Sequence, residues 1–171
     1  MRLNSFPFAM SPHHQPRRTD TQENEYQRLL REVFEERICF NKLLGLQVLS
    51  LQHDAPRLGF AMRRELIGSY SHGRLHGGVI SAVLDTIGGL AVTVAIGEKF
   101  NNESAEQVVH RFARIGTIDL RVDYLRPGVG DRFEATAQVT RLGGRIASTQ
   151  MSLLDQEGLV IATGAAAYVV S

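Results

Sequence analysis

Apolar residues return every three or four positions in the first part of the chain, which is the spacing of an amphipathic helix. The pattern begins at Thr21 and predicts a helix that ends near Phe40-Asn41. Residues 1–20 are polar, carry three prolines and show no periodicity. We therefore expect residues 1–20 to be a disordered N-terminal tail and residues 21–171 to form a single domain.

Two short apolar-rich runs follow, at 46–52 and 57–63, and predict two strands joined by a turn. A loop rich in Gly and Ser, at 68–74, leads into the most apolar segment of the chain, 77–97. A segment that is apolar on every side is typical of a helix wrapped by its own protein or of a membrane span. Asp85 near its centre would cost about 2.5–3.5 kcal/mol in a bilayer, so we expect a core helix and no membrane span.

The last third of the chain is all strand, after a polar stretch at 98–113 in which Ser104 and Gln107 predict a capped short helix. Residues 117–124 alternate between apolar and polar side chains, and turn signals such as Gly143-Gly144 separate the later runs. The resulting order is a helix, two strands, a long buried helix and a meander of three long strands. This order predicts an α+β fold in which an antiparallel sheet wraps around one apolar helix.

Composition and charge narrow the possible functions. The 171 residues are 43% hydrophobic and carry a net charge of +1, so they offer no large basic field for nucleic acid. A single cysteine, Cys39, excludes an internal disulfide and a Cys-rich zinc site, and we expect it to be a packed thiol. The pair His13-His14 could bind a metal, but two histidines in a tail seldom do, and we expect no metal site. No segment has the continuous apolar core of a signal peptide, so we expect a cytoplasmic protein.

The run His76-Gly77-Gly78, with Asp85 further along, carries the candidate chemistry. The two glycines stand where a loop becomes a helix, so their N–H groups lack helical partners and lie at the positive end of the helix dipole. Such an end accepts an anion, or an oxygen that becomes one during a reaction. Asp85 is the only charged residue of the apolar segment, and a poorly solvated carboxylate favours a base or a nucleophile. The alternatives are a tight turn at the glycines, a structural, hydrogen-bonded Asp85, and a His76 that fixes the loop by a hydrogen bond.

The spacing of these groups predicts a dimer. Eight residues of helix rise about 12 Å, whereas an oxyanion donor and a base must each lie about 3 Å from the reacting atoms. One copy of the helix therefore cannot supply both groups to one carbonyl. Two copies that lie antiparallel across a two-fold axis can, because Gly77 of each then comes beside Asp85 of the other. If the protein is an enzyme of this kind, we expect a homodimer or a dimer of dimers.

These residues and their spacing make the sequence resemble the hotdog-fold thioesterases, in the branch that includes phenylacetyl-CoA thioesterase. That branch carries His-Gly-Gly and an acid seven residues after the second glycine, as His76-Gly77-Gly78 and Asp85 do here. The segment Thr117–Pro127 is similar to the strand of the family that leads into a Tyr-Leu-Arg/Lys-Pro stretch. Within the branch, the sequence closely resembles the medium- and long-chain acyl-CoA thioesterases of proteobacteria.

The resemblance implies hydrolysis of acyl-CoA to a free acid and coenzyme A, with no cofactor because coenzyme A is part of the substrate. It implies that Asp85 activates a water or attacks the thioester itself, and that Gly77 N–H of the other subunit polarises the carbonyl. The resemblance also makes His76 part of the catalytic motif. It places Gly78 beside the substrate and Thr117 near the attacking water. The residues that it places against the pantetheine arm and the phosphates are Arg126, Pro127, Gly143, Gly144 and Arg145. A guanidinium beside a glycine turn suits a phosphate, although a solvated hairpin arginine explains Arg145 equally well.

One position departs from the family pattern. Many relatives have an Asn six or seven residues before the His, and its amide helps to hold the carbonyl oxygen. Here Tyr70 and Ser69 stand at those positions. A hydroxyl of Ser69, Tyr70 or Ser71 could take that role, and Tyr70 could instead line the acyl pocket.

Two other functions remain open on the same fold. One is a non-catalytic protein that binds or senses acyl-CoA. The other is a dehydratase or hydratase, which pairs a histidine with the acid, and it is less favoured because His76 is the only histidine of the motif.

Overall fold

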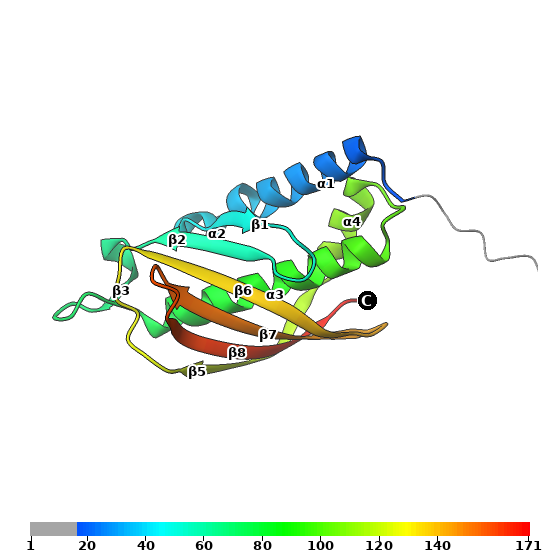
Figure 1. Cartoon of the computed structure of the whole chain (residues 1–171). Coiled ribbons are helices and arrows are strands. Elements are labelled where there is room, and N and C mark those ends of the chain that lie inside the picture. The colour runs from blue at the N-terminus through cyan, green and yellow to red at the C-terminus, as the bar shows by residue number, and fades with distance from the viewer. Residues whose placement is uncertain (1–16) are drawn as a thin grey trace, which may run out of the picture.

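The long apolar segment forms helix α3, Gly77–Lys99, and the other elements are arranged around it. In the computed structural model, which describes residues 17–171, a six-stranded antiparallel sheet curves around α3 (Figure 1). Helices α1, Asp20–Glu32, and α4, Ala105–Phe112, pack together at its C-terminal end. This confirms the α+β fold with an antiparallel sheet around one apolar helix. The segment 98–113 thus covers the end of α3 that is remote from Gly77.

Helix α3 is long and apolar enough to cross a membrane by length and composition alone. However, 67% of its most apolar stretch is buried inside the protein. Burial of this kind is the mark of a core helix, because a spanning helix would turn its apolar side chains to lipid.

The strand order of the main sheet is β1-β2-β6-β7-β8-β5, and each neighbouring pair is antiparallel. The strands are β1 (Gln47–Ser50), β2 (Arg57–Ala61), β5 (Gly116–Tyr124), β6 (Arg132–Leu142), β7 (Ile146–Asp155) and β8 (Val160–Val169). Strands β6, β7 and β8 form the expected meander. Strand β5 precedes them in the chain but pairs with β8, so it lies at the edge of the sheet, three strands away from β6.

The loop expected at 68–74 contains a small hairpin. Strands β3 (Ile67–Ser69) and β4 (Arg74–Leu75) follow a short 3-10 turn, η2 (Arg64–Leu66), and project from the body of the molecule (Figure 1).

The first helical segment is interrupted where the pattern predicts one continuous helix. Helix α1 begins at Asp20, after a capping box formed by Thr19, and it continues as a π-helical segment, η1 (Val33–Arg37). Ile38 is extended, and α2 (Cys39–Leu44) follows it. The expected tail covers residues 1–20. Residues 1–16 of it, which include the pair His13-His14, lie outside the described residues.

The buried amide of Asn41 secures this break. Its Nδ2 donates to the carbonyl of Phe34 at 3.0 Å, and its Oδ1 accepts from the hydroxyl of Thr86, on α3, at 3.2 Å. Asn41 is 2% exposed, and a buried amide must be hydrogen-bonded to avoid a large desolvation cost. It therefore fixes α2 against both η1 and the central helix.

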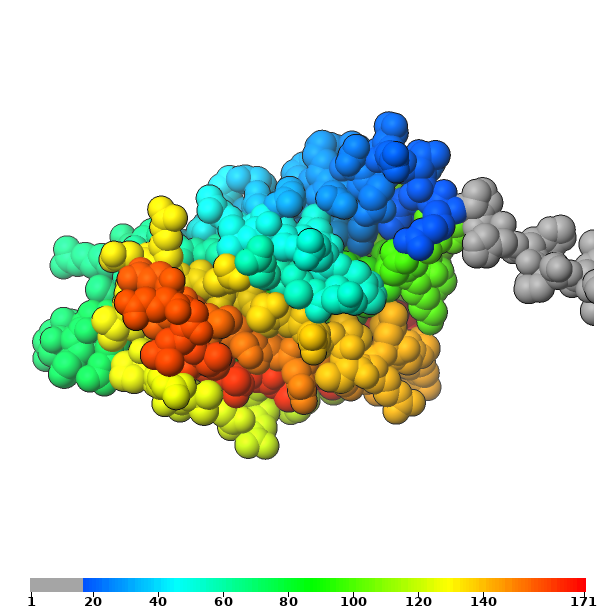
Figure 2. All heavy atoms as spheres, in the orientation of Figure 1, coloured from blue at the N-terminus to red at the C-terminus, as the bar shows by residue number. Residues whose placement is uncertain are grey.

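The two edges of the sheet differ. At the β1 edge, the Glu35 carboxylate accepts from Val48 N–H at 2.7 Å, and the Arg31 guanidinium donates to the Val48 carbonyl. At the other edge, none of the nine residues of β5 is buried, and within residues 17–171 only β8 pairs with it. The side chains of β5 form part of the lower rim of the view in Figure 2. An edge strand with unpaired N–H and C=O groups is a template for pairing with another strand.

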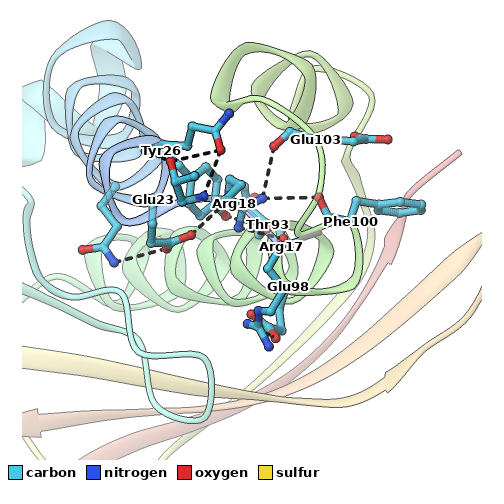
Figure 3. A network of polar contacts seen from close by, with 12 residues as sticks. Arg17, Arg18, Glu23, Tyr26, Thr93, Glu98, Phe100 and Glu103 are labelled. Carbon is cyan, nitrogen blue, oxygen red and sulfur yellow. Dashed lines mark hydrogen bonds and ion pairs between the residues drawn. The ribbon is translucent and has the colours of Figure 1, made fainter. Parts of the chain in front are cut away.

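Arg18 closes the C-terminal end of α3 (Figure 3). Its side chain is only 4% exposed, its Nε lies 2.9 Å from a Glu23 carboxylate oxygen, and its guanidinium stacks 4.5 Å from the centre of the Tyr26 ring. It also donates to the backbone carbonyls of Gly97, Phe100 and Glu103. Because the last carbonyls of a helix lack helical partners, a cation there satisfies them and complements the helix dipole.

We expect Arg18→Ala to lower the free energy of unfolding by about 2–4 kcal/mol, because the part-buried carbonyls of Gly97 and Glu103 lose the Arg18 donor. Arg17→Ala is the matched control, since the ion pair of Arg17 with Glu98 is exposed and should contribute about 0–1 kcal/mol. Urea unfolding of both variants measures the difference. Equal losses in the two variants would contradict the role of Arg18.

Candidate active site

Asp85 lies on the face of α3 that turns toward β5 and β8. Its Oδ1 accepts from the hydroxyl of Thr117, on β5, at 2.9 Å and from that of Tyr168, on β8, at 3.3 Å. Its neighbours Val83 and Leu84 are fully buried in the core, whereas Asp85 is partly exposed in the single chain. The carboxylate is therefore held by two hydroxyl donors and still reaches solvent, rather than lying in an apolar pocket as its sequence neighbours suggest.

Tyr168 is a residue of the site that the sequence pattern does not single out. Its hydroxyl donates to the main-chain carbonyl of Asp85 at 3.0 Å as well as to the carboxylate. The ring is 1% exposed and fits against α3 only because residue 88 is glycine, since a Cβ there would lie 2.1 Å from the hydroxyl oxygen. Burial, together with the charge of Asp85, raises the pKa of Tyr168. The hydroxyl therefore remains a donor to Asp85 at neutral pH.

The start of α3 presents one free amide rather than two. His76 is the N-cap, and its Nδ1 accepts from Gly78 N–H at 2.9 Å, so its role in fixing the loop is confirmed. Among the described residues, the Gly77 N–H has no hydrogen-bond partner. The Gly77 carbonyl accepts from the hydroxyl of Tyr124, at the end of β5, at 3.0 Å. The free donor is thus Gly77 N–H, which lies at the positive end of a 23-residue helix.

The candidate residues fall into two groups, one at each end of β5. Thr117 and Asp85 lie at the start of the strand, and Tyr124 and Gly77 lie at its end. The register of β5, β8 and β7 adds the β6–β7 turn to the first group, because Gly116 pairs with Val169 and Val169 with Ile146. The full sets are Asp85, Thr117, Tyr168, Gly143, Gly144 and Arg145 at one end, and His76, Gly77, Gly78, Tyr124, Arg126 and Pro127 at the other. One chain therefore contains two half-sites, one at each end of β5, and their residues Gly77 and Asp85 stand about 12 Å apart along α3.

The two arginines at these ends have different surroundings. Arg126 donates to the carbonyl of Val160 at 2.8 Å. Arg145 is exposed at the β6–β7 turn, and within residues 17–171 its guanidinium has no ion-pair partner. It is therefore free to bind an anion.

Tyr70 is not part of either half-site in the single chain. It stands in the turn between β3 and β4 and is 97% exposed. The neighbouring Ser71 hydroxyl bonds to His72 Nδ1 at 2.7 Å, so this hairpin has its own polar contacts.

Comparisons with known proteins identify the class of protein. The family described as Thioesterase superfamily matches residues 72–162, which contain both the helix start and Asp85. The chain belongs to this superfamily and is an enzyme of the thioester hydrolase class, and its sheet and central helix form the hotdog fold.

One relative by sequence and two solved structures show which members of the superfamily the chain resembles. The sequence is 36% identical over 143 residues to the medium/long-chain acyl-CoA thioesterase YigI of Escherichia coli, covering 84% of this chain and 92% of that protein. A Shewanella oneidensis protein related to the thioesterase superfamily superposes with a TM-score of 0.82 at 36% identity, over 90% of this chain and all of that one. A candidate thioesterase from Syntrophus aciditrophicus gives a TM-score of 0.78 at 33% identity, over 89% of this chain and all of that one.

The two buried tyrosines that touch α3 predict a loss of stability in alkali. Burial raises the pKa of Tyr26 and Tyr168 above the ordinary value of 10.0. Above pH 10 the unfolded chain therefore releases phenol protons that the folded chain keeps, so stability falls as pH rises. We expect a slope of about 1.4 kcal/mol per pH unit for each tyrosine. The measurement is urea unfolding between pH 9 and pH 11.5. Tyr168→Phe should remove the contribution of one tyrosine to the fall of the unfolding free energy with pH, whereas the exposed control Tyr70→Phe should leave that fall unchanged.

Proposed function

We propose that this protein hydrolyses acyl-CoA thioesters with medium to long acyl chains to free acids and coenzyme A. The named activity of the Escherichia coli relative supports this substrate class. The observation that carries the proposal is the division of the candidate residues between the two ends of an open edge strand. This arrangement makes complete sites only when two copies of the chain meet along β5.

We infer a homodimer formed by antiparallel pairing of β5 with its twin. A two-fold axis between Leu120 and Arg121 would bring Thr117 of one chain opposite Tyr124 of the other. Asp85 of each subunit would then lie beside Gly77 of the other, as the spacing along the helix requires. The open edge of β5 and its exposed apolar side chains Ile118 and Tyr124 support this interface. At the β1 edge, by contrast, side chains already bond to the N–H and C=O groups of Val48. A dimer of dimers would use a further surface.

In the proposed reaction, the thioester carbonyl oxygen accepts from Gly77 N–H of one subunit, which stabilises the negative charge that develops on it. Asp85 of the other subunit either takes a proton from the attacking water or attacks the carbonyl carbon itself. The C–S bond then breaks, and coenzyme A leaves as a thiolate that takes up the proton of the water molecule that is consumed. In the second route the acyl group first stays on Asp85 as an anhydride, which a water molecule then hydrolyses to the free acid and the Asp85 carboxylate. The hydroxyls of Thr117 and Tyr168 orient the carboxylate, and the reaction needs no cofactor.

The same dimer would bring Arg145 of one subunit toward Arg126 of the other. Arg145 is exposed and has no ion-pair partner in the part of the chain that the structure describes, which suits a contact with the phosphates of coenzyme A. Arg126 and Pro127 would lie nearer the pantetheine arm. We place such a homodimer in the fatty-acid metabolism of the cytoplasm.

The Gly77 amide can be tested with a matched pair of substitutions. His76 has φ −65° and ψ 136°, which is compatible with a following proline, and proline is favoured at the first position of a helix. Gly77→Pro therefore deletes the N–H without breaking the helix, whereas Gly77→Ala adds a Cβ and keeps the N–H. We expect Gly77→Pro to lower kcat for octanoyl-CoA hydrolysis by about 10²–10³-fold and Gly77→Ala to change it by only a few fold. Equal activity of the two variants would remove the amide from the mechanism.

The sharing of the site between subunits can be tested with mixed dimers. We expect Asp85→Asn to fold as a dimer of twice 19.0 kDa and to lose activity by orders of magnitude. A heterodimer of Asp85→Asn and Gly77→Pro subunits has both lesions at one site and none at the other. An equal, fully exchanged mixture should therefore recover about a quarter of wild-type activity, since half of the dimers are mixed.

Several outcomes would contradict the proposal. No recovery in the mixture would mean that both residues act within one chain. Wild-type activity in Asp85→Asn would remove Asp85 from the chemistry. Tight binding of acyl-CoA by the wild type without thiol release would indicate the non-catalytic binding protein instead.

A further inference from the structure

A groove opens at the N-terminal end of α3, between this helix, α2 and the segment that leads into β3. Its volume is about 650 Å³, within the range of small-molecule sites. Most of its lining is apolar. The apolar lining residues are Phe40, Leu43, Leu44, Leu66, Ile67 and Val79.

The groove reaches the proposed reaction centre. His76 and Gly78, the two residues on either side of the free amide of Gly77, are part of its lining. A thioester carbonyl bound to that amide would therefore have the mouth of the groove within reach of its alkyl chain. The carboxylate of Asp85 on the same chain lies about 12 Å further along the helix, so it does not compete for this space.

The outer wall of the groove is apolar yet exposed. Phe40 and Leu43 lie three residues apart on α2, hence on one face of the helix, and are 54% and 66% exposed. The only charged side chains of the lining are Arg63 and Glu65, and the Arg63 guanidinium donates to the Leu43 carbonyl at the end of α2. Together with the contacts of Asn41, this fixes the wall before any ligand arrives. An alkyl chain would bury both side chains without the need to satisfy a polar group.

A second groove of about 550 Å³ fits an alkyl chain less well. It lies over β1, β2 and β6, and five charged or amide side chains line it: Gln47, Arg132, Glu134, Asp155 and Gln156. No residue from the start of α3 lines it. Leu49, which is 45% exposed, is the apolar residue on its rim that best matches Leu43.

We propose that the alkyl chain of the acyl-CoA substrate lies in the groove between α2 and the start of α3, and that Phe40 and Leu43 determine the preferred chain length. This inference rests on the proposed function. Each methylene that enters the groove should raise kcat/KM about fourfold, until the groove is filled.

The experiment is a hydrolysis panel from butyryl- to palmitoyl-CoA with wild type, Leu43→Glu, Phe40→Ser and the control Leu49→Glu. Both groove variants should lower kcat/KM for dodecanoyl-CoA at least tenfold and change that for butyryl-CoA less than twofold. Leu49→Glu should keep the wild-type profile. Because Leu43 is mostly exposed, its substitution should leave the fold and the dimer intact, which the unfolding transition and the molecular mass check.

A binding measurement separates recognition from catalysis. Dodecyl-CoA, a thioether that cannot be hydrolysed, should inhibit the wild type, and its inhibition constant should rise at least tenfold in Leu43→Glu, while that of butyl-CoA stays the same. An equal loss for all chain lengths, an unchanged profile, or the same loss in Leu49→Glu would overturn the inference and leave the proposed hydrolysis standing. A Leu43→Glu protein that becomes monomeric would show that the groove holds the partner subunit, and it would overturn the inference too. A wild type that hydrolyses no acyl-CoA would overturn both.

Discussion

Helix α3 is apolar on almost every side, and the rest of the molecule is built to keep it from water. The sheet curves around it, while α1 and α4 close its C-terminal end. The contact is so close that only glycine fits at positions 88 and 97, where Tyr168 and Tyr26 approach from opposite sides. The part of α3 that borders β5 is covered by a single edge strand, and Asp85 and Gly77 both lie there. The polar chemistry thus occupies the side of the helix that the fold leaves least covered.

A rigid helix also fixes how far apart the reacting groups stand. Gly77 and Asp85 can never meet on one copy of α3, because the helical hydrogen bonds hold them about 12 Å apart. The open edge of β5 runs alongside both groups, whereas at the β1 edge Arg31 and Glu35 bond to the backbone of Val48. The rigid helix thus divides the site, and the open edge of β5 lies where a second copy of the chain could complete it.

The N-terminal end of α3 combines two kinds of recognition. The free N–H of Gly77 suits an oxygen that gains negative charge, and the apolar groove beside it suits a hydrocarbon chain. Neither feature depends on a charged side chain within the groove. His76 links them, because its ring caps the helix and also lines the groove. An ester of a long-chain acid presents both features to such a surface, one at its carbonyl and the other at its tail.

The sequence by itself determined the elements whose signals are local. The alternation in β5, the apolar run of α3 and the capping box of Ser104 with Gln107 follow from side-chain period and backbone hydrogen bonding, and the structure has all three. Only the tertiary structure decided which distant residues meet. Tyr168 contacts Asp85 from 83 residues away, β5 pairs with β8 rather than β6, and Asn41 holds the break after η1 by bonds to Phe34 and to α3. These contacts depend on how the sheet wraps the helix, and no period along the chain encodes that.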